Sequence, residues 1–216
     1  MENTPPFTPV NFFQLNMEIL RLPSPKESPF TLTSKNYRKY LLPNLEALTS
    51  ESPFAEVALG WSPDGIEIYV AIEQSYLKSI YPQYDKGDSI ELCIDTRDVK
   101  TSGYNTRFCH HFFFLPEAVE GLQAGELTKF RTEDAHPLCD SQELKIQCSF
   151  KSKSYTLNGF IPANCLEGYD PAQFDRMGMT YRINRADGPS QHFSVMAEDF
   201  KFQEQPSLWS SVRLLK

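Results

Sequence analysis

Polar side chains that can bind a ligand recur at alternate positions of three strand-like segments. Alternate residues of a strand share one face, so each set faces one way. The set comprises Glu91 in SIELCID, Arg107 and His111 in TRFCHHFFFL, and Arg182 and Asn184 in TYRIN. If these strands adjoin, acids and arginines gather on one surface. Arginine and carboxylate groups bind adjacent hydroxyls in bidentate fashion, so the cluster predicts a site for a sugar or another polyhydroxy ligand.

Aromatic residues flank these segments in the sequence. Trp61 ends the strand-like run FAEVALGW, and Tyr84 lies in a Tyr-rich connector before SIELCID. Because aromatic rings stack on the apolar faces of sugar rings, Trp61 or Tyr84 is expected to form a wall of the site. The alternative is an ordinary solvated strand face with tyrosines at the sandwich edge. If the face binds a sugar, replacing Glu91 or Arg182 by Ala is expected to abolish sugar binding and to leave the melting temperature nearly unchanged. On a plain solvated face, neither binding nor stability would respond.

Two metal chemistries come into consideration. Asp95 and Asp98, with the carbonyls after them, offer oxygen ligands of the kind that calcium takes. His110 and His111 are adjacent on a strand and point to opposite faces, so they cannot chelate one ion. His136 and Cys139 have HxxC spacing, but the sequence near them supplies no two further zinc ligands. Calcium is therefore the cation that these residues suggest, a cap on the turn at the strand end is the alternative, and no other cofactor is predicted.

A catalytic role is not predicted. Glu91 and Asp95 lie four residues apart, which is about 13 Å along a strand and too far for a retaining pair of glycosidase carboxylates. The sequence holds no GxSxG, HExxH, GxxxxGK[ST] or GxGxxG motif. These observations favour a binding domain.

Composition narrows the class of protein further. The 216 residues carry a net charge of −7, and aromatics make up 13% of the chain, which indicates a globular protein with a substantial core. The acidic balance and the lack of a basic stripe disfavour nucleic-acid binding. No run of about 18 apolar residues exists, so no membrane association is expected. A protein partner stays open.

The cysteines and the N-terminus predict a compartment. The five cysteines, an odd number without a CxxC pair, favour free thiols and no disulfide. The first twenty residues have an acid at position 2 and polar residues that break every apolar run, unlike a secretory signal. Both observations predict a cytoplasmic protein.

Period-two alternation organises the chain. Residues 1–30 are Pro-rich and are expected to form an arm that wraps the domain, with a short strand within residues 11–22 and with Ile19 buried. Residues 31–216 are expected to form a single domain of eight or nine short strands. The turn Ser62-Pro63-Asp64-Gly65 predicts a hairpin, and residues 116–143 are predicted to be a long loop. The pattern predicts an all-β, two-sheet antiparallel sandwich, jelly-roll-like.

The order of these segments carries a family resemblance. The runs GWSPDGIEIYVAIEQ, YDKGDSIELCIDTRD, RFCHHFFFLP and YTLNGFIPANCL, with the closing PSLWSSVRL, resemble family 9 carbohydrate-binding modules and the wider DOMON-like β-sandwich group. The resemblance covers roughly residues 54–216. It implies a jelly-roll-like sandwich, structural calcium, and a sugar end held between two aromatic rings with polar helpers. Other members of the wider group hold haem or another sugar-like ligand.

The resemblance places the rings only in part. Trp61 occupies the place of the aromatic before the first hairpin turn, and only Phe193 stands where a second clamp ring is expected. Two functions therefore remain open. One is a non-catalytic carbohydrate-binding module, and the other is an interaction or scaffold protein that keeps the sandwich without a sugar site.

Overall fold

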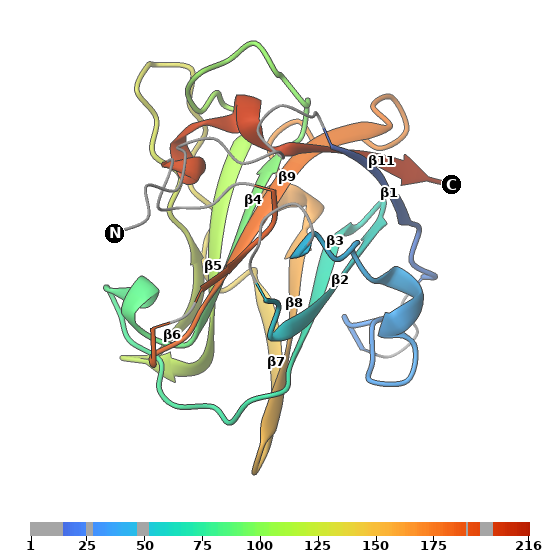
Figure 1. Cartoon of the computed structure of the whole chain (residues 1–216). Helices are drawn as coiled ribbons and strands as arrows, with labels where there is room; N and C mark the ends of the chain where they lie inside the picture. Colours follow the sequence, from blue (N-terminus) through green and yellow to red (C-terminus); the bar gives the residue numbers. More distant parts are fainter. Residues whose placement is uncertain (1–14, 25–27, 47–51, 189, 195–200) are drawn as a thin grey trace.

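Two β-sheets face each other and make the body of the molecule (Figure 1). The computed structural model describes residues 15–24, 28–46, 52–188, 190–194 and 201–216. Five 3-10 turns of three or four residues lie within them: η2 (Tyr37–Tyr40), η3 (Tyr84–Lys86), η4 (Ala163–Cys165), η5 (Phe202–Glu204) and η6 (Pro206–Leu208). None of these is long or apolar enough to cross a membrane. The predicted all-β sandwich is confirmed.

The larger sheet contains seven strands and the smaller sheet four. The larger sheet runs, in spatial order, through β1 (Asn16–Leu20), β11 (Ser210–Leu215), β9 (Arg176–Asn184), β4 (Ser89–Asp95), β5 (Cys109–Val119) and β6 (Leu122–Glu126), with β10 (Ser190–His192) also paired to β9. The smaller sheet runs through β2 (Ala55–Ser62), β3 (Gly65–Ile72), β8 (Ser154–Pro162) and β7 (Lys145–Lys151). The pairs are antiparallel except β1 with β11, which are parallel.

The predicted hairpin is the β2–β3 pair, closed by the turn at residues 62–65. Gly65 has φ +148°, and a Cβ there would lie 2.1 Å from the carbonyl oxygen of Ile161 on β8. Only glycine suits that backbone and that approach. The turn therefore fixes the hairpin and also its contact with the next strand of the sheet.

The main core lies between the two sheets. The six residues expected in it are all at most 1% exposed: Ile66, Ile68, Val70, Ile90, Leu92 and Ile94. Their alternation along β3 and β4 places them on the faces that meet. Trp61 joins this core at 3% exposure.

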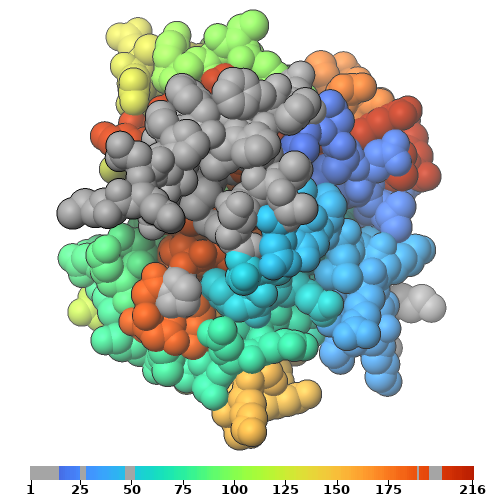
Figure 2. All heavy atoms as spheres, viewed as in Figure 1, coloured from blue at the N-terminus to red at the C-terminus, as the bar shows by residue number. Residues whose placement is uncertain are grey.

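The N-terminal segment contributes a strand to the larger sheet. β1 pairs with β11 so that Asn16 lies opposite Ser211, and the blue and red surfaces of these two strands lie side by side in Figure 2. Ile19 is buried, as expected. The first fourteen residues, with Phe7, Phe12 and Phe13, lie outside the described part of the chain.

One strand was missed by the sequence reading. Residues 116–143 do not form a loop throughout, because β5 extends to Val119 and β6 follows at Leu122–Glu126. The segment of β6 reads LQAGE, whose glycine argues against a strand. A Cβ at Gly125 would lie 2.8 Å from the ring of Phe113, so the glycine makes room for that ring on β5.

The prediction that all five cysteines are free is wrong. Cys139 and Cys165 form a disulfide, with their Cα atoms 5.0 Å apart, while Cys93, Cys109 and Cys148 are free. Cys139 lies in the long loop between β6 and β7, and Cys165 in η4. An odd number of cysteines still allows some of them to pair. The spacing of the cysteines along the sequence does not show that the long loop brings Cys139 next to Cys165.

Candidate functional site

Three neighbouring strands bring four of the five predicted polar residues together on the outer face of the larger sheet. In the register of β4 with β9, Glu91 lies opposite Arg182 and Ser89 opposite Asn184. In the register of β4 with β5, His111 lies opposite Cys93, one diagonal step from Glu91. The period of two sets these positions on the same face, and the strand order makes them neighbours.

The carboxylate of Glu91 is the centre of this cluster. Its Oε1 accepts hydrogen bonds from Arg182 Nε at 2.6 Å and from Asn184 Nδ2 at 2.8 Å. Its Oε2 lies 2.8 Å from His111 Nε2. Asn184 also donates to the hydroxyl of Ser89. Four of the predicted ligand-binding residues are therefore joined in one network: Glu91, His111, Arg182 and Asn184.

This polar face is covered and not solvated. Every residue of β4 is buried, and the Glu91 side chain is 0% exposed. The C-terminal segment closes over the sheet, because Phe202 and Trp209 pack on Cys93 and Cys109, and the Arg182 guanidinium lies 5.2 Å from the Phe202 ring centre. The expectation of an ordinary solvated face is therefore wrong.

Burial and partners act in opposite directions on the pKa of Glu91. Burial alone raises the pKa of a carboxyl group, but the hydrogen bond from His111 and the charges of His111 and Arg182 lower it below its usual value. Burial also raises the pKa of the Tyr84 hydroxyl, with a further contribution from the nearby Glu91 charge. Glu91 is thus held as a carboxylate and Tyr84 as a neutral phenol.

A small cavity opens beside the network. Its volume is about 160 Å³. It is lined by Tyr84, His111, Leu127, Lys129, Gln203 and Glu204. Tyr84 is half-buried in η3, with one ring face stacked on Phe113 at 5.6 Å between centroids. The cavity combines an aromatic wall with a polar rim and the His111 end of the Glu91 network.

Two of the predicted site residues lie elsewhere. Arg107 precedes β5, is about half exposed, and forms an ion pair with Asp134. Trp61 is in the core between the sheets, where its Nε1 donates to the carbonyl of Leu215 and Arg21 lies over its ring. The structure therefore leaves Tyr84 as the predicted ring that lines the cavity.

The predicted calcium ligands have other partners. Asp95 Oδ1 and Oδ2 accept the backbone N–H groups of Arg97 and Val99 at 3.0 and 2.6 Å. The Asp98 carboxylate lies 2.6 Å from the ammonium group of Lys100, and it also accepts the hydroxyl hydrogen of Ser211. A lysine ammonium in contact with the carboxylate opposes a bound cation. These residues therefore do not fit a calcium ion as they stand, and their role is to cap the turn after β4.

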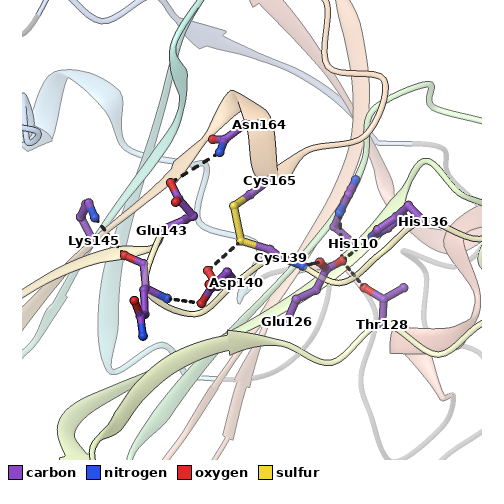
Figure 3. Close-up of a disulfide and its surroundings, with 11 residues drawn as sticks. His110, Glu126, Thr128, His136, Cys139, Asp140, Glu143, Lys145, Asn164 and Cys165 are labelled. Carbon is purple, nitrogen blue, oxygen red and sulfur yellow. Dashed lines mark hydrogen bonds and ion pairs between the residues drawn. A yellow bond between two sulfur atoms is a disulfide. The ribbon is translucent and has the colours of Figure 1, made fainter.

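Sequence spacing missed a second buried cluster, formed by His110, Glu126 and His136. Its ligand atoms all lie within 4.8 Å of one another. The three residues come from β5, from the end of β6 and from the following loop. Figure 3 shows both imidazoles beside the Glu126 carboxylate, next to the disulfide. The one hint in the sequence was the HxxC run at residues 136–139, of which His136 belongs to the cluster. Its partners His110 and Glu126 come near it only through the pairing of β5 with β6.

Sequence comparisons identify no relative, since neither the models of known protein families nor the curated proteins match the chain. Solved structures do. A family 9 carbohydrate-binding module from Caldicellulosiruptor kristjanssonii in complex with cellotriose has a TM-score of 0.60 and 13% identity, covering 92% of this chain and 93% of that one. The chain has the fold of the family 9 carbohydrate-binding modules.

Two further structures agree with this fold. A family 9 carbohydrate-binding module from the same organism, in complex with glucose, also gives a TM-score of 0.60 at 13% identity, over 92% of this chain and 95% of that one. A protein from Bacteroides uniformis ATCC 8492 that is considered carbohydrate-binding gives 0.54 at 8% identity, over 93% and 99%. The family 9 fold therefore extends over nearly the whole chain, and the resemblance of the segments from residue 54 onward reflects that fold.

The lowered pKa of Glu91 predicts acid sensitivity. A carboxyl group whose pKa is lower in the folded than in the unfolded protein stabilises the folded state. This stabilisation is complete above the pKa that the group has in the unfolded chain, about 4.3, and is lost as the pH falls through the pKa that it has in the folded protein. Denaturant unfolding followed from pH 6 downward should therefore show a steeper loss for wild type than for Glu91→Gln. Equal slopes for the two proteins would show that Glu91 ionisation does not contribute.

Proposed function

We propose that the protein is a non-catalytic carbohydrate-binding module that takes the end of a sugar chain in the cavity beside Tyr84. The observation that carries the proposal is the position of this cavity: it lies against a network of carboxylate, arginine, amide and imidazole groups, in the family 9 fold. Solved modules of that fold were determined with cellotriose and with glucose. A glucose-type ring is therefore the first ligand to test.

The chemistry of the cavity suits one sugar ring. The Tyr84 ring offers an apolar face for the C–H face of a sugar. Lys129, Gln203 and Glu204 offer charged and amide groups to its hydroxyls. His111, oriented by Glu91, supplies an imidazole at the cavity wall. Both Glu91 oxygens are engaged by protein donors, which favours binding over acid–base catalysis at this site.

The alternative, an interaction or scaffold protein, is favoured by one observation. Glu91 is wholly buried and Phe202 lies against Arg182, so the described structure leaves only a small opening above the network. Under this alternative the network serves the fold, and the cavity binds no sugar. Sugar titration separates the two functions.

Calorimetric titration with glucose and cellotriose tests the proposal. Wild type should bind, and Tyr84→Ala should bind at least about tenfold more weakly, since loss of a stacked ring costs about 1.4 kcal/mol or more. Tyr84→Phe keeps the ring and should bind nearly as wild type does. Tyr104→Ala is the matched control, because Tyr104 is 41% exposed and does not line the cavity. If Tyr84→Ala bound sugar with unchanged affinity, the proposed site beside Tyr84 would be wrong. If no sugar on a glycan array bound to the wild-type protein, the scaffold alternative would be favoured.

A further inference from the structure

The cluster of His110, Glu126 and His136 is buried at one end of the sandwich. Its three side chains are at most 4% exposed. His110 stands on the inward face of β5, where its ring is parallel to that of Phe112, two residues on. In the register of β5 with β6, Phe112 lies opposite Glu126, so the Glu126 carboxylate and the His110 ring are diagonal neighbours. The two strands thus fix two members of the cluster.

The third member is held by its own set of contacts. The His136 ring contacts two other rings, stacked on His110 at 4.2 Å and edge-on to Phe130 at 4.9 Å between centroids. The disulfide at Cys139 ties this part of the loop to η4, beside the cluster in Figure 3. The imidazole of His136 is thereby oriented before any ligand arrives.

Two imidazole nitrogens converge on a single oxygen. His110 Nδ1 lies 3.0 Å and His136 Nε2 2.8 Å from Glu126 Oε1. Thr128 donates to the same oxygen at 2.6 Å, and the Cys139 N–H donates to Oε2 at 2.8 Å. A carboxylate with such outer hydrogen bonds and two imidazoles facing it is an arrangement typical of a metal centre.

The orientation of His136 strengthens this interpretation. Its Nδ1 lies 2.6 Å from the carbonyl oxygen of Arg107, which can only accept, so Nδ1 carries the hydrogen. In a neutral imidazole, Nε2 then presents a lone pair. That lone pair faces the Glu126 carboxylate, which is also an acceptor. Either a proton or a metal cation must lie between them.

We propose that His110 Nδ1, His136 Nε2 and Glu126 bind one divalent cation of the zinc class. Two imidazoles and a carboxylate are ligands that Zn²⁺ prefers, at about 2.0–2.2 Å each. An ion at those distances needs each nitrogen about 3.4 Å from the carboxylate oxygen. The two nitrogen-to-oxygen distances, 3.0 and 2.8 Å, must therefore each lengthen by about half an ångström. A water completes four-coordination. The cation links β5, β6 and the His136 loop, and it is independent of the sugar site.

Metal binding to the full chain, freed of metal with a chelator, tests the proposal. Titration with Zn²⁺ alone should saturate at one ion per chain and raise the melting temperature. Titration with Co²⁺ should give the visible bands of a tetrahedral ion without the charge-transfer band of a thiolate ligand. In NMR spectra, two of the four histidine imidazoles should shift on addition of Zn²⁺. This last readout needs no variant.

Variants then locate the site. His136→Gln should weaken Zn²⁺ binding by more than about 100-fold, beyond what loss of an outer hydrogen-bond partner costs. His192→Gln is the control for a histidine outside the cluster and should bind as wild type does. No stoichiometric Zn²⁺ binding by wild type would overturn the proposal and leave a protonated His136 holding the loop. Imidazole shifts confined to His111 and His192, or a thiolate band with Co²⁺, would overturn it as well.

Discussion

Replacement of Glu91 by Ala is expected to lower the free energy of unfolding by about 3–5 kcal/mol. The carboxylate is 0% exposed, and its removal leaves the Arg182 guanidinium, the His111 imidazole and the Asn184 amide without their shared acceptor. A buried charge without its partner costs far more than the pair gains when it forms. Urea unfolding, fitted for unchanged slope, measures the effect. This expectation replaces the sequence-based prediction that Glu91→Ala would abolish sugar binding at a nearly unchanged melting temperature, which assumed that Glu91 serves a ligand and not the fold.

The chain offers a matched control for Glu91→Ala. Glu18 and Arg213 form a Glu–Arg pair at 3.8 Å between adjacent strands, with both side chains about half exposed. Exposed pairs contribute about 0–1 kcal/mol, so Glu18→Ala should change stability by no more than that. The double variant Glu91→Leu with Arg182→Met should recover part of the loss, because apolar replacement removes the unpaired charge. A Glu91→Ala protein as stable as the Glu18→Ala protein would show that the network does not support the fold.

The sequence predicted those parts of the site that depend on strand parity. Glu91, His111, Arg182 and Asn184 occupy positions of one parity in segments that alternate clearly, so their shared face followed from period two alone. Their proximity needed the spatial order of the strands as well, which the sequence left open and which the pairing of β4 with β5 and β9 supplies. The same argument wrongly placed Arg107 in the cluster, because β5 begins only at Cys109 and Arg107 lies outside the strand.

Burial of the polar face could not be predicted from its own strands. What covers it is the segment with Phe202 and Trp209, which follows β9 and is distant in the sequence from β4 and β5. The position of Trp61 was also open, since a Trp at the end of a strand fits either a ligand wall or a core. Its register opposite Ile66 places it in the core. The His110–Glu126–His136 cluster needed the β5–β6 register and the path of a loop, neither of which local spacing encodes.

Loss of the disulfide is the second large effect expected. Cys139 and Cys165 are 26 residues apart, and closing a loop of that length in the unfolded chain corresponds to about 3.5 kcal/mol of stabilisation in the chain-entropy model. The double variant Cys139→Ser with Cys165→Ser should therefore lose stability of that order in urea unfolding. The disulfide also removes one premise of the cytoplasmic prediction, because such bonds persist in oxidising compartments. Localisation stays a prediction that rests on the N-terminal sequence.

Counting reactive thiols shows whether the disulfide is present, independently of any change in stability that the serine substitutions cause. Under denaturing, non-reducing conditions the oxidised protein should show three reactive thiols, those of Cys93, Cys109 and Cys148, and all five after reduction. Cys148→Ser is the control, because Cys148 is a half-buried free thiol whose loss opens no cross-link. Wild type with added reductant should unfold like the double variant, whereas the double variant itself should not respond to reductant. Five reactive thiols without reductant, or equal stability of wild type with and without it, would contradict a structural role for this bond.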